Sequence, residues 1–444
     1  MSALPTPLKL ISKDLPLHKN NKRIWIATDK LRETELIQKL TYHYKINKNK
    51  KQLIISSNEN DNRKITVRKT NNVPIIDINN EDITELFKNI DKIIVKIYNH
   101  QIVIEPLKES LEQNRAKAKL KHKKITFVDI FAGSGTLSEA LKKTGMIPIS
   151  AVEFDDEYLS NFEKNNKKTI TYNTSVTEMD LDLLPKDATG VVAGVPCENY
   201  CPSGISKQKS LKGKSKEQGL TGHLGYYFIK AIEHIRPSFF ILEEVIGFRT
   251  SIMMDIIRKV LMERGYKLTE KILKANEYGS MTKRKRFCCV GIIGEKPFEF
   301  SSQTSMNLRT VKDILEVDIK NRVWLDKNNS KSIAYNLEKE LRDKEAGKGF
   351  KIARTYLTDT LIATITKGYF RNQSTNPIIV HPEDENKFSW FTPRELARLQ
   401  GLDDDFVLPS SNNKSGEILG QGVSQEPFIQ VSEDIKSYLK KYYN

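Results

Sequence analysis

A cysteine and a glutamate of this chain stand directly after apolar runs, where covalent and acid–base chemistry is expected. Cys197 follows Pro196 and the run Val191–Ala193, which predicts a buried strand that leads into a polar loop. A thiol at such a junction is held by the strand, while the loop can close over a substrate. Glu243 follows a second apolar run, 239–242. The two side chains therefore have the character of a nucleophile and an acid.

The cysteines also allow other interpretations. A buried cysteine is often only a small hydrophobic residue. Cys201 competes with Cys197 as the nucleophile, but it lies inside the polar loop and has no proline before it. A zinc site is disfavoured, because the four cysteines are spaced C-x3-C and as an adjacent pair rather than as C-x2-C knuckles. The sequence therefore favours Cys197 and predicts no metal site.

The elements that must position these side chains alternate between strands and helices from residue 125 onward. Strands are predicted over 125–130, 147–152, 190–195 and 239–242. This alternation predicts an α/β fold with a doubly wound, Rossmann-like sheet. Ligands bind at the carboxyl edge of the strands in such sheets. Cys197 and Glu243 both follow strands, so both are expected at that edge.

The ends of the first two predicted strands have the form of a nucleoside-cofactor site. The turn after the first strand comprises Phe131, Ala132, Gly133, Ser134 and Gly135. Its glycines permit close backbone approach, and the helix that follows offers free N–H groups. Glu153 ends the second strand, where a carboxylate can accept hydrogen bonds from two ribose hydroxyls, and Phe154 can pack on an adenine. The spacing lacks the full dinucleotide fingerprint, which favours S-adenosylmethionine over NAD.

The order of these features is similar to that of the cytosine-5 DNA methyltransferase family, over about 125–295 and 388–432. The matching residues, in chain order, are Phe131-Ala-Gly-Ser-Gly135, Glu153, Pro196-Cys197, Glu243-Glu244-Val245, Arg284-Lys285-Arg286, Thr392-Pro-Arg-Glu395, Arg398-Leu-Gln400 and Gly420-Gln421-Gly-Val423. The resemblance implies transfer of a methyl group from S-adenosylmethionine to carbon 5 of a cytosine that is flipped out of duplex DNA.

The resemblance also implies roles for individual residues. Cys197 attacks carbon 6, Glu243 holds or protonates ring nitrogen 3, and Arg284 and Arg286 support the base and the covalent intermediate. The lysine-rich loop 198–222 is expected to cover the base and contact phosphates. The residues implied to bind the cofactor are Phe131, Ala132, Gly133, Gly135, Glu153, Phe154, Pro196, Gln421 and Val423.

Several positions depart from the family pattern. Glu244 and Gln421 stand where the family has asparagine, Thr282 and Glu198 where it has glutamine, and Ser175 where it has an acid. A second carboxyl beside Glu243 is expected to raise the pKa of the catalytic acid or to redirect its contacts.

Composition and pattern divide the chain into five segments. Residues 1–106 contain an internal repeat of strand, short helix, strand and strand, offset by about fifty residues, and this pattern is similar to the swapped-hairpin barrel of the AbrB and SymE-like families. The other segments are a basic linker at 107–124, which is expected to be helical or flexible, the catalytic domain at 125–295, a target-recognition region at 296–387, and a return to the catalytic domain at 388–444. Within that return, Leu419–Leu439 is expected to form a strand and a helix.

The charge and composition indicate the class of partner. The net charge is +16, and residues 1–124 hold 26 Lys and Arg against 14 Asp and Glu. We therefore expect double-stranded DNA as a partner. The resemblance allows a cognate restriction endonuclease as a further partner, and the oligomeric state stays open, with a monomer as one option. Few cysteines and no apolar run of membrane-spanning length favour the cytoplasm and no membrane. Two alternatives stay open: methylation of cytosine in RNA such as tRNA, and a DNA-binding regulator with an inactive methyltransferase fold.

Overall fold

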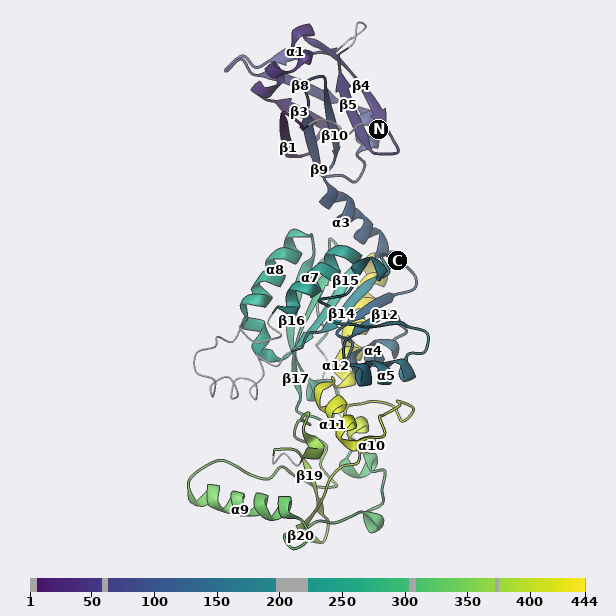
Figure 1. Ribbon diagram of the computed structural model, residues 1–444, viewed down its shortest axis with the longest axis vertical. Helices are drawn as coiled ribbons and strands as arrows, with labels where there is room; N and C mark the ends of the chain where they lie inside the picture. The colour runs from purple at the N-terminus through teal and green to yellow at the C-terminus, as the bar shows by residue number, and fades with distance from the viewer. Residues whose placement is uncertain (1–5, 58–62, 197–222, 303–308, 372–374, 444) are drawn as a thin grey trace. The chain divides into compact units, whose positions relative to one another are not determined.

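A computed structural model describes residues 6–57, 63–196, 223–302, 309–371 and 375–443. The chain forms two compact units, Met1–Arg115 and Ala116–Asn444. Figure 1 traces the elements of each unit along the chain. No described helix has both the length and the apolar character that crossing a membrane requires.

In the first unit, the order strand, short helix, strand, strand occurs twice. The first copy comprises β3 (Asn21–Ala27), α1 (Glu35–Lys39), β4 (Thr41–Asn47) and β5 (Gln52–Ser56). The second copy comprises β8 (Pro74–Asn79), α2 (Glu81–Leu86), β9 (Lys92–Ile97) and β10 (Gln101–Pro106). The short strands β1 (Lys9–Asp14) and β2 (Leu17–His18) precede the first copy, and β6 (Arg63–Lys64) and β7 (Thr66–Val67) precede the second.

The two copies of the repeat pair with each other through equivalent strands. β3 pairs with β8, and β5 pairs with β10, both antiparallel. In addition, β1, which precedes the first copy, pairs with β9 of the second copy. Likewise β6, which precedes the second copy, pairs with β4 of the first copy. The resulting sheets have the orders β1-β9-β10-β5-β4-β6 and β2-β3-β8-β7, and they enclose one apolar core. The relation to the AbrB and SymE-like families stays a prediction.

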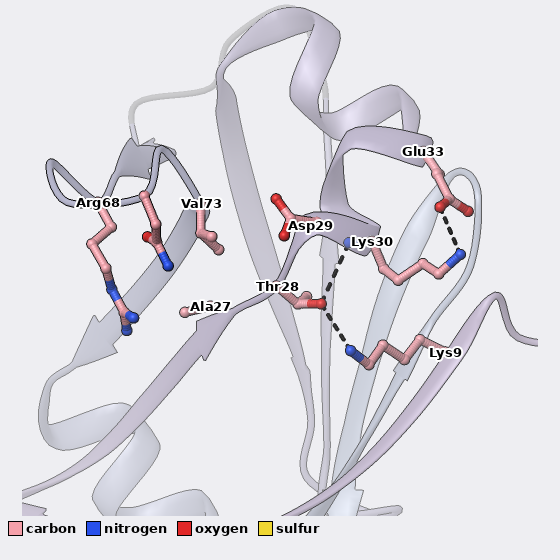
Figure 2. A pocket seen from close by; sticks show the side chains of 9 residues that line it. Lys9, Ala27, Thr28, Asp29, Lys30, Glu33, Arg68 and Val73 are labelled. Atoms are coloured by element: carbon pink, nitrogen blue, oxygen red, sulfur yellow. Dashed lines mark hydrogen bonds and ion pairs between the residues drawn. The ribbon is translucent and has the colours of Figure 1, made fainter.

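A cavity of about 450 Å³ opens in the first unit beside the end of β3 (Figure 2). Two of the cations that line it already have protein partners. Lys9 Nζ donates to Thr28 Oγ1 at 3.0 Å, and Lys30 Nζ lies 2.6 Å from Glu33 Oε1. The third, Arg68, packs over the ring of Trp25.

The second unit contains a seven-stranded sheet of order β13-β12-β11-β14-β15-β17-β16. The strands are β11 (Thr126–Ile130), β12 (Ile147–Glu153), β13 (Ile170–Asn173), β14 (Gly190–Gly194), β15 (Phe239–Glu244), β16 (Lys267–Lys274) and β17 (Lys285–Ile292). The first five strands in the sheet order are parallel, and β17 runs antiparallel to both of its neighbours. The predicted doubly wound α/β sheet is confirmed.

Helices alternate with these strands. They are α4 (Thr136–Lys142), α5 (Asp156–Asn165), α7 (Leu224–Ile235), α8 (Ile252–Glu263) and, from the end of the chain, α12 (Gln425–Tyr442). α7 packs against α8, and α4 packs against α12. The apolar strands β11, β14 and β15 are buried almost completely, as expected for parallel strands covered on both faces. The chain order reverses between β11 and β14, and ligands bind at such a reversal in open α/β sheets.

The segment expected as a basic linker, 107–124, is mostly the helix α3 (Lys108–Lys119), and its end belongs to the second unit. Ala116 and Leu120 are buried in the apolar core of that unit. Lys119 is 4% exposed, and its ammonium donates to the carbonyls of Lys186, Ala188 and Ile235. Three carbonyls satisfy the three donors of a buried ammonium. The division between the two units therefore falls within this helix, after Arg115.

The region 296–387 has two packing centres. α9 (Lys331–Glu345) packs with the small sheet β18 (Arg354–Thr355), β19 (Ile378–His381) and β20 (Asp384–Ser389) around a core that includes Ile333 and Phe388. A second core joins this region to α10 (Pro393–Leu399) and α11 (Asn412–Gln421). The strand expected within Leu419–Leu439 is wrong, because α11 ends at Gln421 and α12 begins only four residues later.

Candidate active site

The strand ends of the seven-stranded sheet bring a carboxylate and a guanidinium into contact. Glu243 is the fifth residue of β15, in register with Gly194 on the parallel neighbour β14 and with Cys288 on β17. Arg286 lies near the start of β17, and its Nε is 2.7 Å from Glu243 Oε1. The side chain of Glu243 is 12% exposed, and that of Arg286 is 18% exposed. This nearly buried ion pair stands at the carboxyl edge of β15, where the sequence predicted an acid.

The neighbouring strand leaves room for this acid. A Cβ added to Gly194 would lie 3.2 Å from Glu243 Oε2, which is closer than an ordinary contact. Gly194 is the last residue of β14, and Val195 and Pro196 follow it. The strand that leads to Pro196 therefore passes directly beside the carboxylate. Cys197, Cys201, Glu198 and the rest of the loop 198–222 lie outside the described residues.

Glu244 does not share the surroundings of Glu243. Successive side chains of a strand point to opposite faces of the sheet, and both residues belong to β15. Glu244 is 1% exposed, and its Oε2 accepts a hydrogen bond of 2.7 Å from the backbone N–H of Val245. Strand alternation therefore separates the carboxyls of Glu243 and Glu244, and the expected crowding between them does not occur.

Arg284 and Arg286 line one small pocket but contact different groups. The guanidinium of Arg284 is 2% exposed and donates to the carbonyl oxygens of Ile365, Gly420 and Gln421 at 2.9–3.3 Å. The donors of Arg284 thus engage backbone carbonyls, whereas Arg286 contacts Glu243. Support of the base by both arginines stays a prediction.

The predicted cofactor turn follows β11. Phe131, Gly133 and Gly135 have φ values of +63°, +53° and +81°, a left-handed conformation that glycine adopts without strain. A Cβ on Gly133 would meet no atom within 4 Å, so the space above this residue is open. Ala132 is buried and donates its backbone N–H to Val152 at the end of β12. The turn thus presents an open backbone concavity at the carboxyl edge of the sheet.

The carboxylate of Glu153 faces this turn. Its Oε2 accepts from the N–H of Gly133 at 2.8 Å, and its Oε1 accepts from the N–H groups of Phe154 and Asp155, both at 3.0 Å. Burial raises the pKa of Glu153, and the three N–H donors oppose that shift. Phe154, by contrast, is 69% exposed. An anchored acid and an accessible aromatic ring thus lie side by side.

A second acid lies beneath the turn. Burial raises the pKa of Asp129 to about 7, while a hydrogen bond of 2.5 Å from Ser138 Oγ lowers it and the charge of Glu153 raises it further. Asp129 is 1% exposed and lies inside β11, so it supports the turn from below. The predicted site did not include it, although an acid within an apolar strand is an unusual pattern that could have drawn attention.

The junction between α11 and α12 returns to the cofactor turn. Val423 donates its backbone N–H to Thr136 Oγ1 at 3.2 Å, and Gln425 Nε2 donates to the carbonyl of Thr136 at 2.7 Å. Gln421 Oε1 accepts from the hydroxyl of Tyr158 on α5 at 2.8 Å. The α11–α12 junction therefore contacts the start of α4 through Val423 and Gln425, and α5 through Gln421.

Two of the departures from the family pattern also have defined surroundings. Thr282 is buried, and its hydroxyl lies 3.1 Å from that of Ser424, which donates to Gln400 Oε1 at 2.8 Å. Ser175 bonds to the hydroxyl of Thr177 at 2.8 Å and is half-buried. These hydroxyl contacts therefore link Thr282, which precedes Arg284, to Gln400 and to Ser424, which follows Val423.

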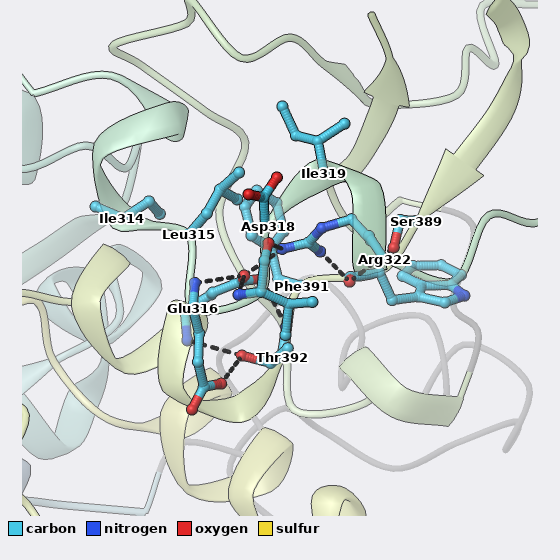
Figure 3. Close-up of polar contacts among 12 residues, drawn as sticks. Ile314, Leu315, Glu316, Asp318, Ile319, Arg322, Ser389, Phe391 and Thr392 are labelled. Atoms are coloured by element: carbon cyan, nitrogen blue, oxygen red, sulfur yellow. Dashed lines mark hydrogen bonds and ion pairs between the residues drawn. The ribbon is translucent and has the colours of Figure 1, made fainter.

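A buried ion pair that the site prediction missed fastens the 296–387 region to α10 (Figure 3). Arg322 and Glu395 have side chains 3% and 0% exposed and lie in direct contact. Glu395 also accepts from the N–H groups of Thr392 and Glu316, both at 2.9 Å. The capping box Thr392-x-x-Glu395 is a sequence signal of the helix start, but it did not reveal the arginine.

Known proteins resemble this chain over most of the second unit. The model of the family described as C-5 cytosine-specific DNA methylase matches residues 125–437. The Type II methyltransferase M.DsaV of Dactylococcopsis salina is 25% identical over 72% of this chain and 88% of its own length. The Type II methyltransferase M.SsoII of Shigella sonnei is 26% identical over 70% and 80%, respectively.

Solved structures share the fold. The Entamoeba histolytica methyltransferase EhMeth superposes with a TM-score of 0.57 at 16% identity, over 72% of this chain and 99% of its own. The S. pombe Dnmt2 methyltransferase superposes with a TM-score of 0.57 at 17% identity, over 71% and 99%. At these identities the likeness concerns the fold alone.

Proposed function

This chain belongs to the C-5 cytosine-specific DNA methylase family, and on that premise we propose that it transfers a methyl group from S-adenosylmethionine to carbon 5 of a cytosine in duplex DNA. The observation that carries the proposal is the Glu243–Arg286 ion pair beside Gly194, on the strand that leads to Pro196. It is an acid held in place at the sheet edge where ligands bind.

We assign Cys197, which follows Pro196 in the sequence, the role of nucleophile. Carbon 5 of cytosine is too weakly nucleophilic to accept a methyl group unaided. Addition of the Cys197 thiolate to carbon 6 moves an electron pair toward carbon 5. Glu243, once it has taken up a proton from solvent, donates that proton or a hydrogen bond to ring nitrogen 3. After carbon 5 gains the methyl group, loss of its proton expels the cysteine and restores the aromatic ring.

In this mechanism Arg286 is a positioning residue for Glu243. Its Nε contact fixes the carboxylate at 2.7 Å, which removes the rotamer freedom that a free glutamate would have. The target base is extruded from the helix to reach this edge, because the ring of a stacked base is not accessible to the thiol.

The residues at the turn after β11 fit S-adenosylmethionine, whose sulfonium supplies the methyl group. The open space above Gly133 admits a ligand close to the backbone, and Glu153 offers a carboxylate that suits ribose hydroxyls. The exposed ring of Phe154 suits an adenine face. We assign Phe131, Ala132, Gly135, Pro196, Gln421 and Val423 to the same site.

The setting follows from the relatives named Type II methyltransferases. We propose that the chain protects a specific duplex site, in the cytoplasm, from a cognate restriction endonuclease. The 296–387 region, with its own core, is the part we assign to reading the site.

The test is methyl transfer from labelled S-adenosylmethionine to mixed-sequence duplex DNA and to bulk tRNA. The proposal expects 5-methylcytosine in DNA, its loss in Cys197→Ser, and its persistence in the matched control Cys201→Ser. Label in tRNA alone would contradict the DNA assignment. DNA binding without label in either substrate would favour an inactive regulator instead.

A further inference from the structure

The positive charge of the first unit is concentrated in one part of its repeat. The unit, Met1–Arg115, contains 21 Lys and Arg and 14 Asp and Glu, a net charge of +7. Residues 36–76 alone contain nine Lys and Arg and two acids, Glu59 and Asp61, which is again +7. The remainder of the unit is therefore neutral overall, although the two copies of the repeat share one fold.

The ion pairs of the unit also differ between residues 36–76 and the remainder. Seven of the Lys and Arg residues outside 36–76 are paired with a carboxylate within the unit, for example Arg23 with Asp77 and Lys96 with Glu105. Among the described residues, no carboxylate lies within ion-pair distance of any of the nine basic residues in 36–76. Glu59 and Asp61 lie outside the described residues. The described carboxylates of the unit therefore leave the charge of this segment available to an external anion.

Seven of these nine residues follow the length of β4, and we call them the β4 basic row. They are Lys39, Lys45, Lys48, Lys50, Lys51, Arg63 and Lys64. Lys39 precedes β4, Lys45 lies within it, and Lys48, Lys50 and Lys51 form the turn to β5. Lys64 pairs in register with Thr41 at the other end of β4. All but Arg63 are exposed.

The dimensions of the row suit a nucleic-acid backbone. Seven residues of strand span about 23 Å, because a strand rises about 3.3 Å per residue. Duplex DNA carries one negative charge per about 1.7 Å of helix axis. A row of cations along β4 and its turn to β5 can therefore neutralise several phosphates at once and release their counterions. No base-reading pattern is required for this kind of contact.

We infer that the β4 basic row binds the phosphate backbone of duplex DNA without sequence preference. The choice of DNA over RNA rests on the proposed function of the second unit. The row is distinct from the cavity of Figure 2, where Lys9 and Lys30 already have partners in the protein.

The experiment compares two quadruple variants of the full chain. The row variant is Lys45→Gln, Lys48→Gln, Lys50→Gln and Lys51→Gln. The control variant removes the same charge from exposed positions of the same unit, with Lys19→Gln, Lys88→Gln, Lys92→Gln and Lys108→Gln. Binding is measured by fluorescence anisotropy against salt on a duplex of about 30 A·T pairs. This duplex has no cytosine, so recognition of a target base cannot contribute.

The row variant is expected to bind the duplex more than tenfold more weakly than wild type at about 100 mM salt. The slope of log Kd against log salt is expected to fall by about three to four, because four phosphate contacts are lost. The control variant is expected to stay close to wild type. Equal binding by the two variants would overturn the inference. So would stronger wild-type binding to an A·U RNA duplex that the row variant loses. Absence of methyl transfer by the wild type, with A·T binding intact, would contradict the proposed function and leave this inference standing.

Discussion

The guanidinium of Arg284 donates two hydrogen bonds, each of 3.0 Å, to the carbonyl oxygen of Gly420. The same guanidinium reaches Gln421 at 2.9 Å and Ile365 at 3.3 Å, so one side chain holds the 296–387 region and the α11–α12 junction together. Gly420 tolerates no side chain there, since a Cβ would lie 2.3 Å from backbone atoms of Thr366.

We therefore predict that Arg284 acts as a positioning residue. Arg284→Met leaves buried carbonyls without donors and is expected to cost about 1–3 kcal/mol for each group that stays unsatisfied. The affinity for S-adenosylmethionine, measured by calorimetry, is expected to fall together with the melting temperature. Lys285→Gln, an exposed neighbour, is the control. A variant with normal cofactor affinity and a selectively lower kcat would instead place Arg284 at the reacting base.

The pair formed by Glu243 and Arg286 is expected to behave as one unit in kinetics. Glu243→Gln should lower kcat by about 10²–10⁴, the usual range for a positioned acid, while cofactor binding is retained. Arg286→Met should also lower kcat, because the carboxylate loses its 2.7 Å contact. The double variant should then cost much less than the two single effects combined. Additive losses would show that the residues act independently.

The buried acid Asp129 is expected to make stability depend on pH. Its pKa is raised to about 7 in the folded protein, so the folded state holds a proton that the unfolded state has already lost above pH 4. Stability should therefore fall as pH rises from about 4 to about 7, by up to about 1.4 kcal/mol per pH unit, and level off above 7. Denaturation at pH 5 and pH 7.5 measures this difference.

Asp129→Asn keeps the polar shape but removes this titration, so its stability should change less between the two pH values than that of the wild type. Asp182→Asn alters an exposed acid of lowered pKa and serves as the control. An unchanged pH dependence in Asp129→Asn would mean that Asp129 is ionised throughout.

The buried contact between Arg322 and Glu395 is expected to be sensitive to loss of either partner. Arg322→Met should cost about 3–5 kcal/mol in unfolding free energy, because it leaves an uncompensated buried carboxylate. Lys387→Gln breaks an exposed pair with Asp384 and should cost less than about 1 kcal/mol. The double variant Arg322→Met with Glu395→Leu should recover part of the loss. Equal melting temperatures for Arg322→Met and Lys387→Gln would contradict this account.

The sequence by itself determined the sheet and the order of its motifs. Short apolar runs such as 239–242, which alternate with helical segments, predict buried parallel strands, and a polar residue at the end of such a strand is expected at the sheet edge. Glu153 and Glu243 were therefore predicted from local pattern alone, together with the α/β fold that carries them. The repeat in the first unit was visible for the same reason, since strand and turn patterns are local.

Only the tertiary structure decided which charged groups meet. Arg284 and Arg286 are two positions apart and look equivalent in the sequence, yet one holds backbone carbonyls from residue 420 and the other holds Glu243. Likewise, Glu243 and Glu244 are consecutive residues of β15, so their side chains point to opposite faces of the sheet and the expected crowding of the two carboxyls does not occur. Such partners are set by packing between elements distant along the chain, and local sequence patterns do not encode that packing.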